Sequence, residues 1–101
     1  MRLSCSSGTR NGTPFVVCSW SRPADRAVAQ YRVWREHDGT RRVIATLPPD
    51  ATTHADRDVV VGATYQYLVE ALDRAGGSVG RTPVVGVACC EAGPPVEPSR
   101  G

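Results

Sequence analysis

The chain has 101 residues, a mass of 10.8 kDa and a formal net charge of +2, which suits one domain with one modest core. This charge excludes the strongly basic face of a nucleic-acid-binding domain. No apolar stretch approaches the roughly 18 residues of a membrane-spanning helix. Valine occurs 14 times and leucine only 4 times, while 10 glycines and 8 prolines punctuate short segments. This composition favours an all-β sandwich or barrel.

Turn-forming residues divide the chain into seven candidate strands. The first runs over residues 3–6, and Asn11-Gly12, a strong hairpin signal, leads into a second strand over 15–20. A third strand, 30–36, is followed by the turn residues Asp38-Gly39 and a fourth strand, 42–47. Residues 52–56, 65–72 and 84–89 complete the set, and the alternation is clearest in 65–72. Seven strands at this spacing are what a small sandwich needs.

Two segments have a second reading or a different character. Ala24, Ala27, Val28, Tyr31 and Trp34 also fall at helical spacing, so periodicity leaves a helix over 24–34 open. Residues 91–101 carry three prolines and almost no apolar content, which predicts a tail or interdomain linker after a domain at 1–90.

Three segments carry a recognisable pattern: Val-Cys-Ser-Trp-Ser-Arg-Pro at 17–23, Tyr-Arg-Val-Trp at 31–34 and Val-Gly-Ala-Thr-Tyr-Gln-Tyr-Leu-Val-Glu-Ala at 61–71. In order and spacing they resemble the fibronectin type III domain, a seven-stranded immunoglobulin-like sandwich of two sheets. The segment at 17–23 resembles its second strand, and the segment at 31–34 its third. The segment at 61–71 resembles its sixth strand, which is entered through a tyrosine corner that would here be Tyr65. The resemblance implies strand structure at 30–36. It also implies a core built from Trp20, Tyr31, Val33, Tyr65, Tyr67 and Val69.

The four cysteines suggest disulfides and hence an oxidising compartment. A hairpin centred between Asn11 and Gly12 makes Cys5 and Cys18 direct cross-strand partners, so we expect them to be bonded. Cys89 and Cys90 then bond each other, stay reduced or pair outside this sequence. Bonding of Cys5 to Cys89 and four free thiols are the alternatives. Cys-x12-Cys-x-Trp is also similar to the first domain of type I cytokine receptors, although a Trp-Ser-x-Trp-Ser repeat is absent.

No motif indicates an enzyme, a cofactor or a metal site. The serines form no Gly-x-Ser-x-Gly elbow, and no glycine-rich phosphate loop is present. His37 and His54 could join the cysteines around zinc, but the spacing is wrong for such a site. We therefore expect a non-catalytic domain without cofactor or metal.

In the resembling fold the third and sixth strands are neighbours, so the residues that alternate with the core face solvent together. We expect Trp34 and Leu68 to form an exposed patch ringed by arginines. The candidate binding residues are Arg32, Trp34, Arg42 and Leu68, with Arg35 and Arg41 nearby. The ligand would be a protein or a polysaccharide.

The function predicted from these observations is that of a spacer or protein-binding module in a larger extracytoplasmic bacterial protein. All 12 basic residues are arginine, which suggests a GC-rich genome. The resemblance implies carbohydrate-active domains as neighbours in the same chain. The alternative is a receptor-like domain that binds a specific protein through the Trp34 face. We expect a monomer that does not insert into membranes and is located outside the cell or on its surface. Its export signal would lie outside this sequence, because residues 1–5 run directly into polar sequence.

Overall fold

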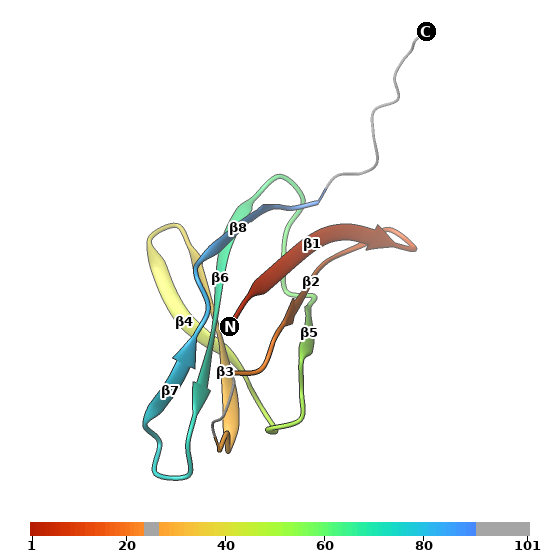
Figure 1. The fold of residues 1–101 in the computed structure, drawn as a ribbon. Coiled ribbons are helices and arrows are strands. Elements are labelled where there is room, and N and C mark those ends of the chain that lie inside the picture. Colours follow the sequence, from red (N-terminus) through yellow and green to blue (C-terminus); the bar gives the residue numbers. More distant parts are fainter. Residues whose placement is uncertain (24–26, 91–101) are drawn as a thin grey trace, which may run out of the picture.

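The computed structural model describes residues 1–23 and 27–90, which form two packed antiparallel sheets (Figure 1). The strands are, in chain order, β1 (Leu3–Arg10), β2 (Thr13–Trp20), β3 (Gln30–His37), β4 (Thr40–Leu47), β5 (Thr53–Asp56), β6 (Thr64–Leu72), β7 (Ser78–Arg81) and β8 (Val85–Ala88). One sheet has the order β1-β2-β5. The other has the order β4-β3-β6-β7, and β8 also pairs with β6. The all-β, two-sheet architecture predicted from the sequence is confirmed.

The β1–β2 hairpin has the register that the sequence predicts. Asn11 and Gly12 have φ angles of 52° and 80°, and positive φ at both central residues is the requirement of a type I′ turn. Cys5 consequently lies opposite Cys18, and Leu3 lies opposite Trp20. The first strand is longer than the expected 3–6, because pairing continues to Arg10 at the turn. The hairpin tip projects beyond the sandwich (Figure 1).

The segment with two readings contains a strand. β3 covers Gln30–His37 and pairs with β4 on one side and β6 on the other. Tyr31 and Val33 point inward and are fully buried, whereas Arg32 and Trp34 alternate with them. The helical alternative is therefore wrong for residues 30–34, because pairing on both edges of the strand outweighs the local helical spacing. Residues 24–26 lie outside the described part of the chain.

The structure has one more strand than the sequence predicts, because the last strand of the sheet is interrupted. β7 and β8 lie along the same edge of β6, with Glu70 opposite Arg81 and Tyr67 opposite Val85. Between them lies Pro83, which has no N–H to donate. Thr82 fills the gap: its backbone N–H donates to the carbonyl oxygen of Val69 at 2.9 Å, and its Oγ1 accepts from the Val69 N–H at 3.1 Å.

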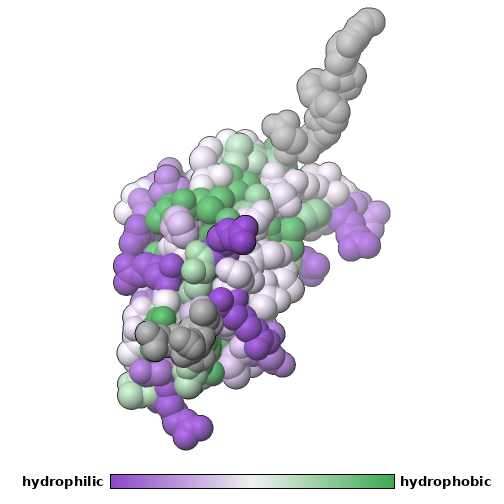
Figure 2. Space-filling view, viewed as in Figure 1, coloured by the Kyte–Doolittle hydropathy of each residue, from purple (hydrophilic) through white to green (hydrophobic). Residues whose placement is uncertain are grey.

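The core lies between the sheets and contains the aromatic residues that the sequence analysis placed there. All six expected core residues are buried: Trp20, Tyr31, Val33, Tyr65, Tyr67 and Val69. The rings of Trp20 and Tyr31 meet edge to face, with centroids 5.6 Å apart. Hydrophilic side chains gather at the hairpin tip and at the β6–β7 turn, and apolar ones occupy much of the surface between (Figure 2).

Two expectations concern the limits of the domain and its relation to membranes. The tail or linker expected at 91–101 lies outside the described residues. Within residues 1–23 and 27–90, no helix is long and apolar enough to cross a bilayer.

Candidate functional site

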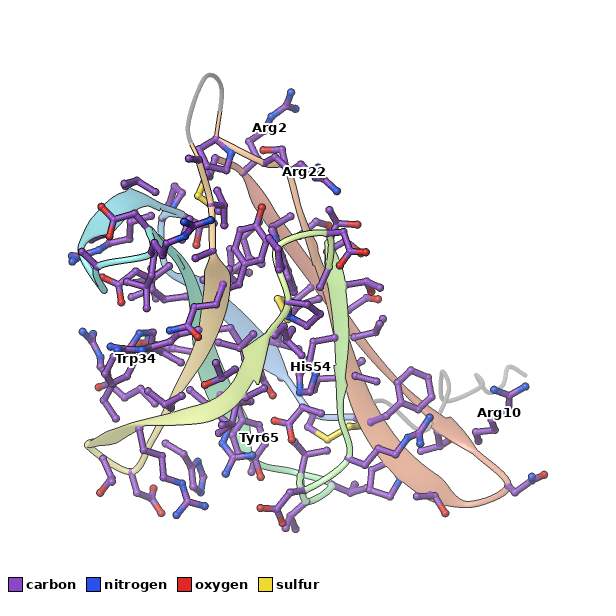
Figure 3. All side chains as sticks on the ribbon, turned by 90° about the horizontal axis from the view of Figure 1, so that it is seen from below. Arg2, Arg10, Arg22, Trp34, His54 and Tyr65 are labelled. Carbon is purple, nitrogen blue, oxygen red and sulfur yellow. A yellow bond between two sulfur atoms is a disulfide. The ribbon has the colours of Figure 1, made fainter. Side chains whose placement is uncertain are left out.

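The outer face of the β4-β3-β6 sheet carries a short apolar strip, defined here as Val43, Trp34, Leu68 and Val84. Register places Trp34 opposite Val43 on β4 and opposite Leu68 on β6. Val84 lines the same small hollow as Trp34 and Leu68. Trp34 projects from β3 away from the interior that Tyr65 occupies (Figure 3). The expected neighbourhood of Trp34 and Leu68 is therefore present.

Charged side chains that border the strip hold Trp34 in place. The indole Nε1 of Trp34 donates to Oε1 of Glu70 at 3.3 Å, and Oε2 of Glu70 lies 3.6 Å from Nη2 of Arg81. Arg32 lies opposite Glu70 on the same face, and Arg41 pairs with Glu36 at 3.2 Å. Trp34 is half-buried as a result, and its indole edge is held by Glu70.

Leu68 does not form part of an exposed patch. It is only 8% exposed, so the expectation that its side chain faces solvent is wrong. The reason is its position on β6, which is paired with β3 on one side and with β7 and β8 on the other. The exposed apolar surface comes instead from Val43 and Val84, at the two ends of the strip.

Arg35 and Arg42 lie on the opposite face from Trp34. They are direct cross-strand partners, and side chains that share a face alternate with those of the other face. Arg35 is buried against the other sheet, and Nη2 of Arg42 lies 4.0 Å from Oδ2 of Asp58. Neither arginine borders the strip, so the predicted placement of Arg42 beside Trp34 is wrong.

The buried Arg35 belongs to an internal polar cluster that joins the two sheets. Its Nη1 donates to both carboxylate oxygens of Asp56, at 3.2 and 2.9 Å, and to the carbonyl oxygen of Asp58 at 2.9 Å. The Tyr67 hydroxyl donates to Oδ2 of Asp56 at 2.7 Å, and the Asp58 N–H donates to Oδ1 at 3.1 Å. Asp56 on β5 thus holds groups from β3 and β6.

The sequence analysis did not identify this cluster. Alternation of side chains along β3 does place Arg35 on the inward face. It does not indicate which carboxylate Arg35 contacts. Burial and the hydrogen bond to Asp56 raise the pKa of Tyr67 far above its ordinary value. Burial likewise raises the pKa of Tyr31. The Tyr67 phenol therefore keeps its proton and donates to Asp56 at physiological pH.

Tyr65 forms the predicted corner. The backbone N–H of Val60 donates to the Tyr65 hydroxyl at 2.9 Å, which ties the entry of β6 to the segment five residues upstream. The guanidinium of Arg35 lies 5.4 Å from the centroid of the same ring, and the His37 imidazole stacks on it at 4.6 Å. His37 is thus a packed residue at the end of β3.

The four cysteines form two disulfides. Cys5 is bonded to Cys18 across the hairpin, with 4.1 Å between their Cα atoms, as the register predicts. Cys89 is bonded to Cys90, so the alternatives of a Cys5–Cys89 bond and of free thiols are contradicted. The Cys89 N–H donates to the Ala63 carbonyl at 2.8 Å, and its carbonyl accepts from the Gly62 N–H at 2.7 Å. These bonds hold the segment after β8 against the turn before β6.

Comparison with known proteins identifies the fold. No known protein family and no curated protein sequence matches the chain. Among solved structures, the sixth fibronectin type III domain of human fibronectin type III domain containing protein 3 is similar, with 22% identity and a TM-score of 0.64. The match covers 96% of this chain and 88% of that one. The chain has the fibronectin type III fold.

Two bacterial enzymes contain a similar structure as a minor part of their length. Pectate lyase PelI from Erwinia chrysanthemi, in complex with tetragalacturonic acid, matches with 21% identity and a TM-score of 0.66 over 85% of this chain. The β-1,2-glucanase of Parabacteroides distasonis matches with 22% identity and a TM-score of 0.70 over 86%. The chain spans 28% of the lyase chain and 12% of the glucanase chain.

Proposed function

We propose that this chain is a non-catalytic module of a larger extracytoplasmic bacterial protein, where it acts as a spacer or protein-binding domain beside an enzyme domain that acts on polysaccharides. The observation that most supports this proposal is the share of each similar structure that this chain matches. The fold accounts for almost all of an isolated fibronectin type III domain, but for 28% and 12% of two bacterial polysaccharide-degrading enzymes. Because one of those enzymes was captured with tetragalacturonic acid, uronate polysaccharides are the substrate class that we propose for the neighbouring enzyme.

The cysteines support the extracytoplasmic part of the proposal. All four form disulfides, and disulfides persist in oxidising compartments but are rare in the bacterial cytosol. Alkylation of the protein immediately on release from its native source, followed by mass spectrometry of a non-reduced digest, should recover Cys5 linked to Cys18. Recovery of alkylated thiols at all four positions would contradict an extracytoplasmic location.

The non-catalytic part is tested in the full natural polypeptide. Replacing this module with an unrelated fibronectin type III domain should leave kcat on short soluble oligosaccharides unchanged, because the module supplies no catalytic group. The isolated chain should release no sugar ends from pectate or β-1,2-glucan. A large fall in kcat on replacement, or turnover by the isolated chain, would show that the module takes part in the chemistry.

A receptor-like recognition domain is the second candidate, and the strip favours it. Val43 and Val84 are 38% and 49% exposed beside the half-buried Trp34, and Trp and Arg are frequent in binding hot spots. In this proposal Trp34 and Arg32 contact a protein partner. Trp34→Ala should abolish capture of that partner from the native extracellular fraction, whereas a spacer would tolerate it. Retention of full binding by Trp34→Ala would remove this candidate.

A further inference from the structure

A groove of about 470 Å³ lies on the outer face of the β1-β2-β5 sheet, away from the strip. The groove is lined by Arg10, Asn11, Thr13, Phe15, Val17, Ala55 and Arg57. Register explains why they meet: Arg10 lies opposite Thr13, Gly8 opposite Phe15, and Val17 opposite Ala55. Val16 and Cys18, which alternate with them on β2, point into the core. The groove is therefore a continuous outward face and not a gap in the core.

Phe15 lies at the centre of this face. Val16 pairs with Asp56, so continuing the register by one residue places Arg57 beside Phe15. Gly8 lies opposite Phe15 on the other side, and Arg10 lies two residues further toward the hairpin tip. A Cβ at Gly8 would come within 3.1 to 3.6 Å of three atoms of the Phe15 ring. The ring thus leans over Gly8, where the missing side chain leaves room for it. This fixes the only phenylalanine of the chain as a half-exposed platform.

The two arginines give this apolar platform a positive border. Within residues 1–23 and 27–90, neither Arg10 nor Arg57 has a carboxylate within ion-pair distance, whereas Arg35, Arg41, Arg42 and Arg81 all do. Both side chains are exposed. Two acidic residues flank Arg57 in sequence. Asp56 is buried on the other face and bonded to Arg35, and Oδ2 of Asp58 lies 3.6 Å from Nη2 of Arg35 and 4.0 Å from Nη2 of Arg42. Arg10 stands out at the hairpin tip, far from Arg2 and Arg22 (Figure 3).

We propose that this groove binds a carboxylate-bearing oligosaccharide, with a sugar ring on Phe15 and uronate carboxylates on Arg10 and Arg57. An aromatic ring carries negative charge on its face, which attracts the polarised C–H bonds on the flat side of a sugar ring. A guanidinium binds a carboxylate through two parallel hydrogen bonds, and the Thr13 hydroxyl is placed to bond a sugar hydroxyl. The choice of an acidic sugar rests on the proposed function, and the groove then tethers the neighbouring enzyme to its substrate.

The test is affinity electrophoresis of the whole chain through gels that contain a polyanion or a neutral analogue. Polygalacturonate should retard the chain, whereas highly methyl-esterified pectin, which keeps the sugar and loses the charge, should not. Poly-glutamate, which keeps the charge and lacks the sugar, should also leave mobility unchanged. Titration calorimetry with a galacturonic acid tetramer gives the affinity in solution.

Two matched variants separate the groove from net charge. Arg10→Gln/Arg57→Gln should weaken binding by about tenfold or more, equivalent to about 1.4 kcal/mol. Arg2→Gln/Arg74→Gln removes the same charge from exposed positions outside the groove and should bind as the unaltered chain does. Phe15→Leu, which keeps an apolar side chain over Gly8, should lose the ring-dependent part of the affinity and remain folded by circular dichroism.

Three outcomes would overturn the proposal: no retardation by polygalacturonate, equal retardation by poly-glutamate or esterified pectin, or equal loss in the two arginine pairs. Retardation by poly-glutamate would assign the groove to acidic protein segments instead. Any of these leaves the module proposal standing if the replacement experiment on the natural polypeptide behaves as expected. If the replacement experiment fails but polygalacturonate still binds, the proposal of a non-catalytic module is wrong and the proposal of a binding groove remains.

Discussion

At the scale of single residues, Asp56 does most to connect the two sheets. Its carboxylate accepts hydrogen bonds from Arg35, Tyr67 and the Asp58 N–H. A buried charge is tolerated only when it is paired and its remaining lone pairs are satisfied. Here β3, β6 and the segment after β5 each supply a donor, so the identity of Asp56 is tied to the packing of β3 and β6 against β5.

Asp56→Asn should destabilise the chain by about 3 kcal/mol or more at pH 7, because it leaves Arg35 charged and buried without its buried carboxylate. Urea unfolding followed by tryptophan fluorescence measures this loss. Asp58→Asn is the comparison two residues away: its carboxylate also reaches Arg35, at 3.6 Å, but its side chain is 85% exposed, compared with 6% for Asp56, so its loss should cost much less. An equal loss in both variants would show that Asp56 is not the anchor.

Tyr67 should make the unfolding free energy sensitive to alkaline pH. Its pKa is raised above the ordinary value of 10.0 in the folded chain, so the folded state holds the proton more tightly than the unfolded state does. The stabilisation is complete below pH 10 and falls by about 1.4 kcal/mol per pH unit above it. Tyr67→Phe should cost about 2 kcal/mol at pH 7 and decline less steeply above pH 10, because only Tyr31, whose pKa burial also raises, then contributes. Parallel decline of both proteins between pH 9 and 11.5 would contradict the assignment.

At the scale of elements, the β1–β2 hairpin determines the most. Asn11-Gly12 fixes the turn, the turn fixes the register, and the register brings Cys5 to Cys18 while it turns Phe15 and Val17 outward. A shift of one residue in this register would turn every side chain of the shifted strand to the other face of the sheet. One dipeptide therefore decides both the disulfide and which side chains of β1 and β2 face the groove.

Cys5→Ala/Cys18→Ala should lower the unfolding free energy by about 3 kcal/mol in the chain-entropy account, since the bond closes a loop across the hairpin. Cys89→Ala/Cys90→Ala removes the other disulfide, whose two sulfurs are buried. Because that disulfide joins neighbours in sequence, it restricts the unfolded chain far less, and its loss should cost less. Chemical denaturation of both pairs compares them directly. A larger loss from the second pair would mean that packing, and not loop closure, accounts for the stabilisation.

At the scale of the whole molecule, the sheet edges decide whether copies of the chain associate. β4 is an edge strand of its sheet, and it carries Arg41 and Arg42 together with a register shift opposite Val33 and Trp34. Charges and bulges on an edge strand discourage pairing with another chain. This protection of β4 supports the monomer that we propose.

Arg41→Thr/Arg42→Thr should promote self-association, because threonine is a good strand residue and removes the repulsion between copies. Sedimentation velocity across a concentration series should show a monomer for the unaltered chain and a concentration-dependent dimer for the variant. Arg2→Thr/Arg74→Thr controls for the loss of charge. If the unaltered chain is already a dimer, edge protection by these arginines is excluded.

The sequence by itself determined the class of fold, the hairpin register, the Cys5–Cys18 bond, the tyrosine corner and the six aromatic and aliphatic core positions. The hairpin register and the disulfide depend on local turn chemistry and on alternation along a strand, which can be read from neighbouring residues, whereas the tyrosine corner and the core positions followed from the resemblance to the fibronectin type III domain. Only the tertiary structure decided that Leu68 is covered, that Arg42 faces away from Trp34, and that Asp56 meets Arg35 and Tyr67. It also decided that Arg10, Phe15 and Arg57 share a groove. The physical reason is that burial and ion pairing depend on which strands become neighbours, and β2 and β5 are separated by more than thirty residues of chain.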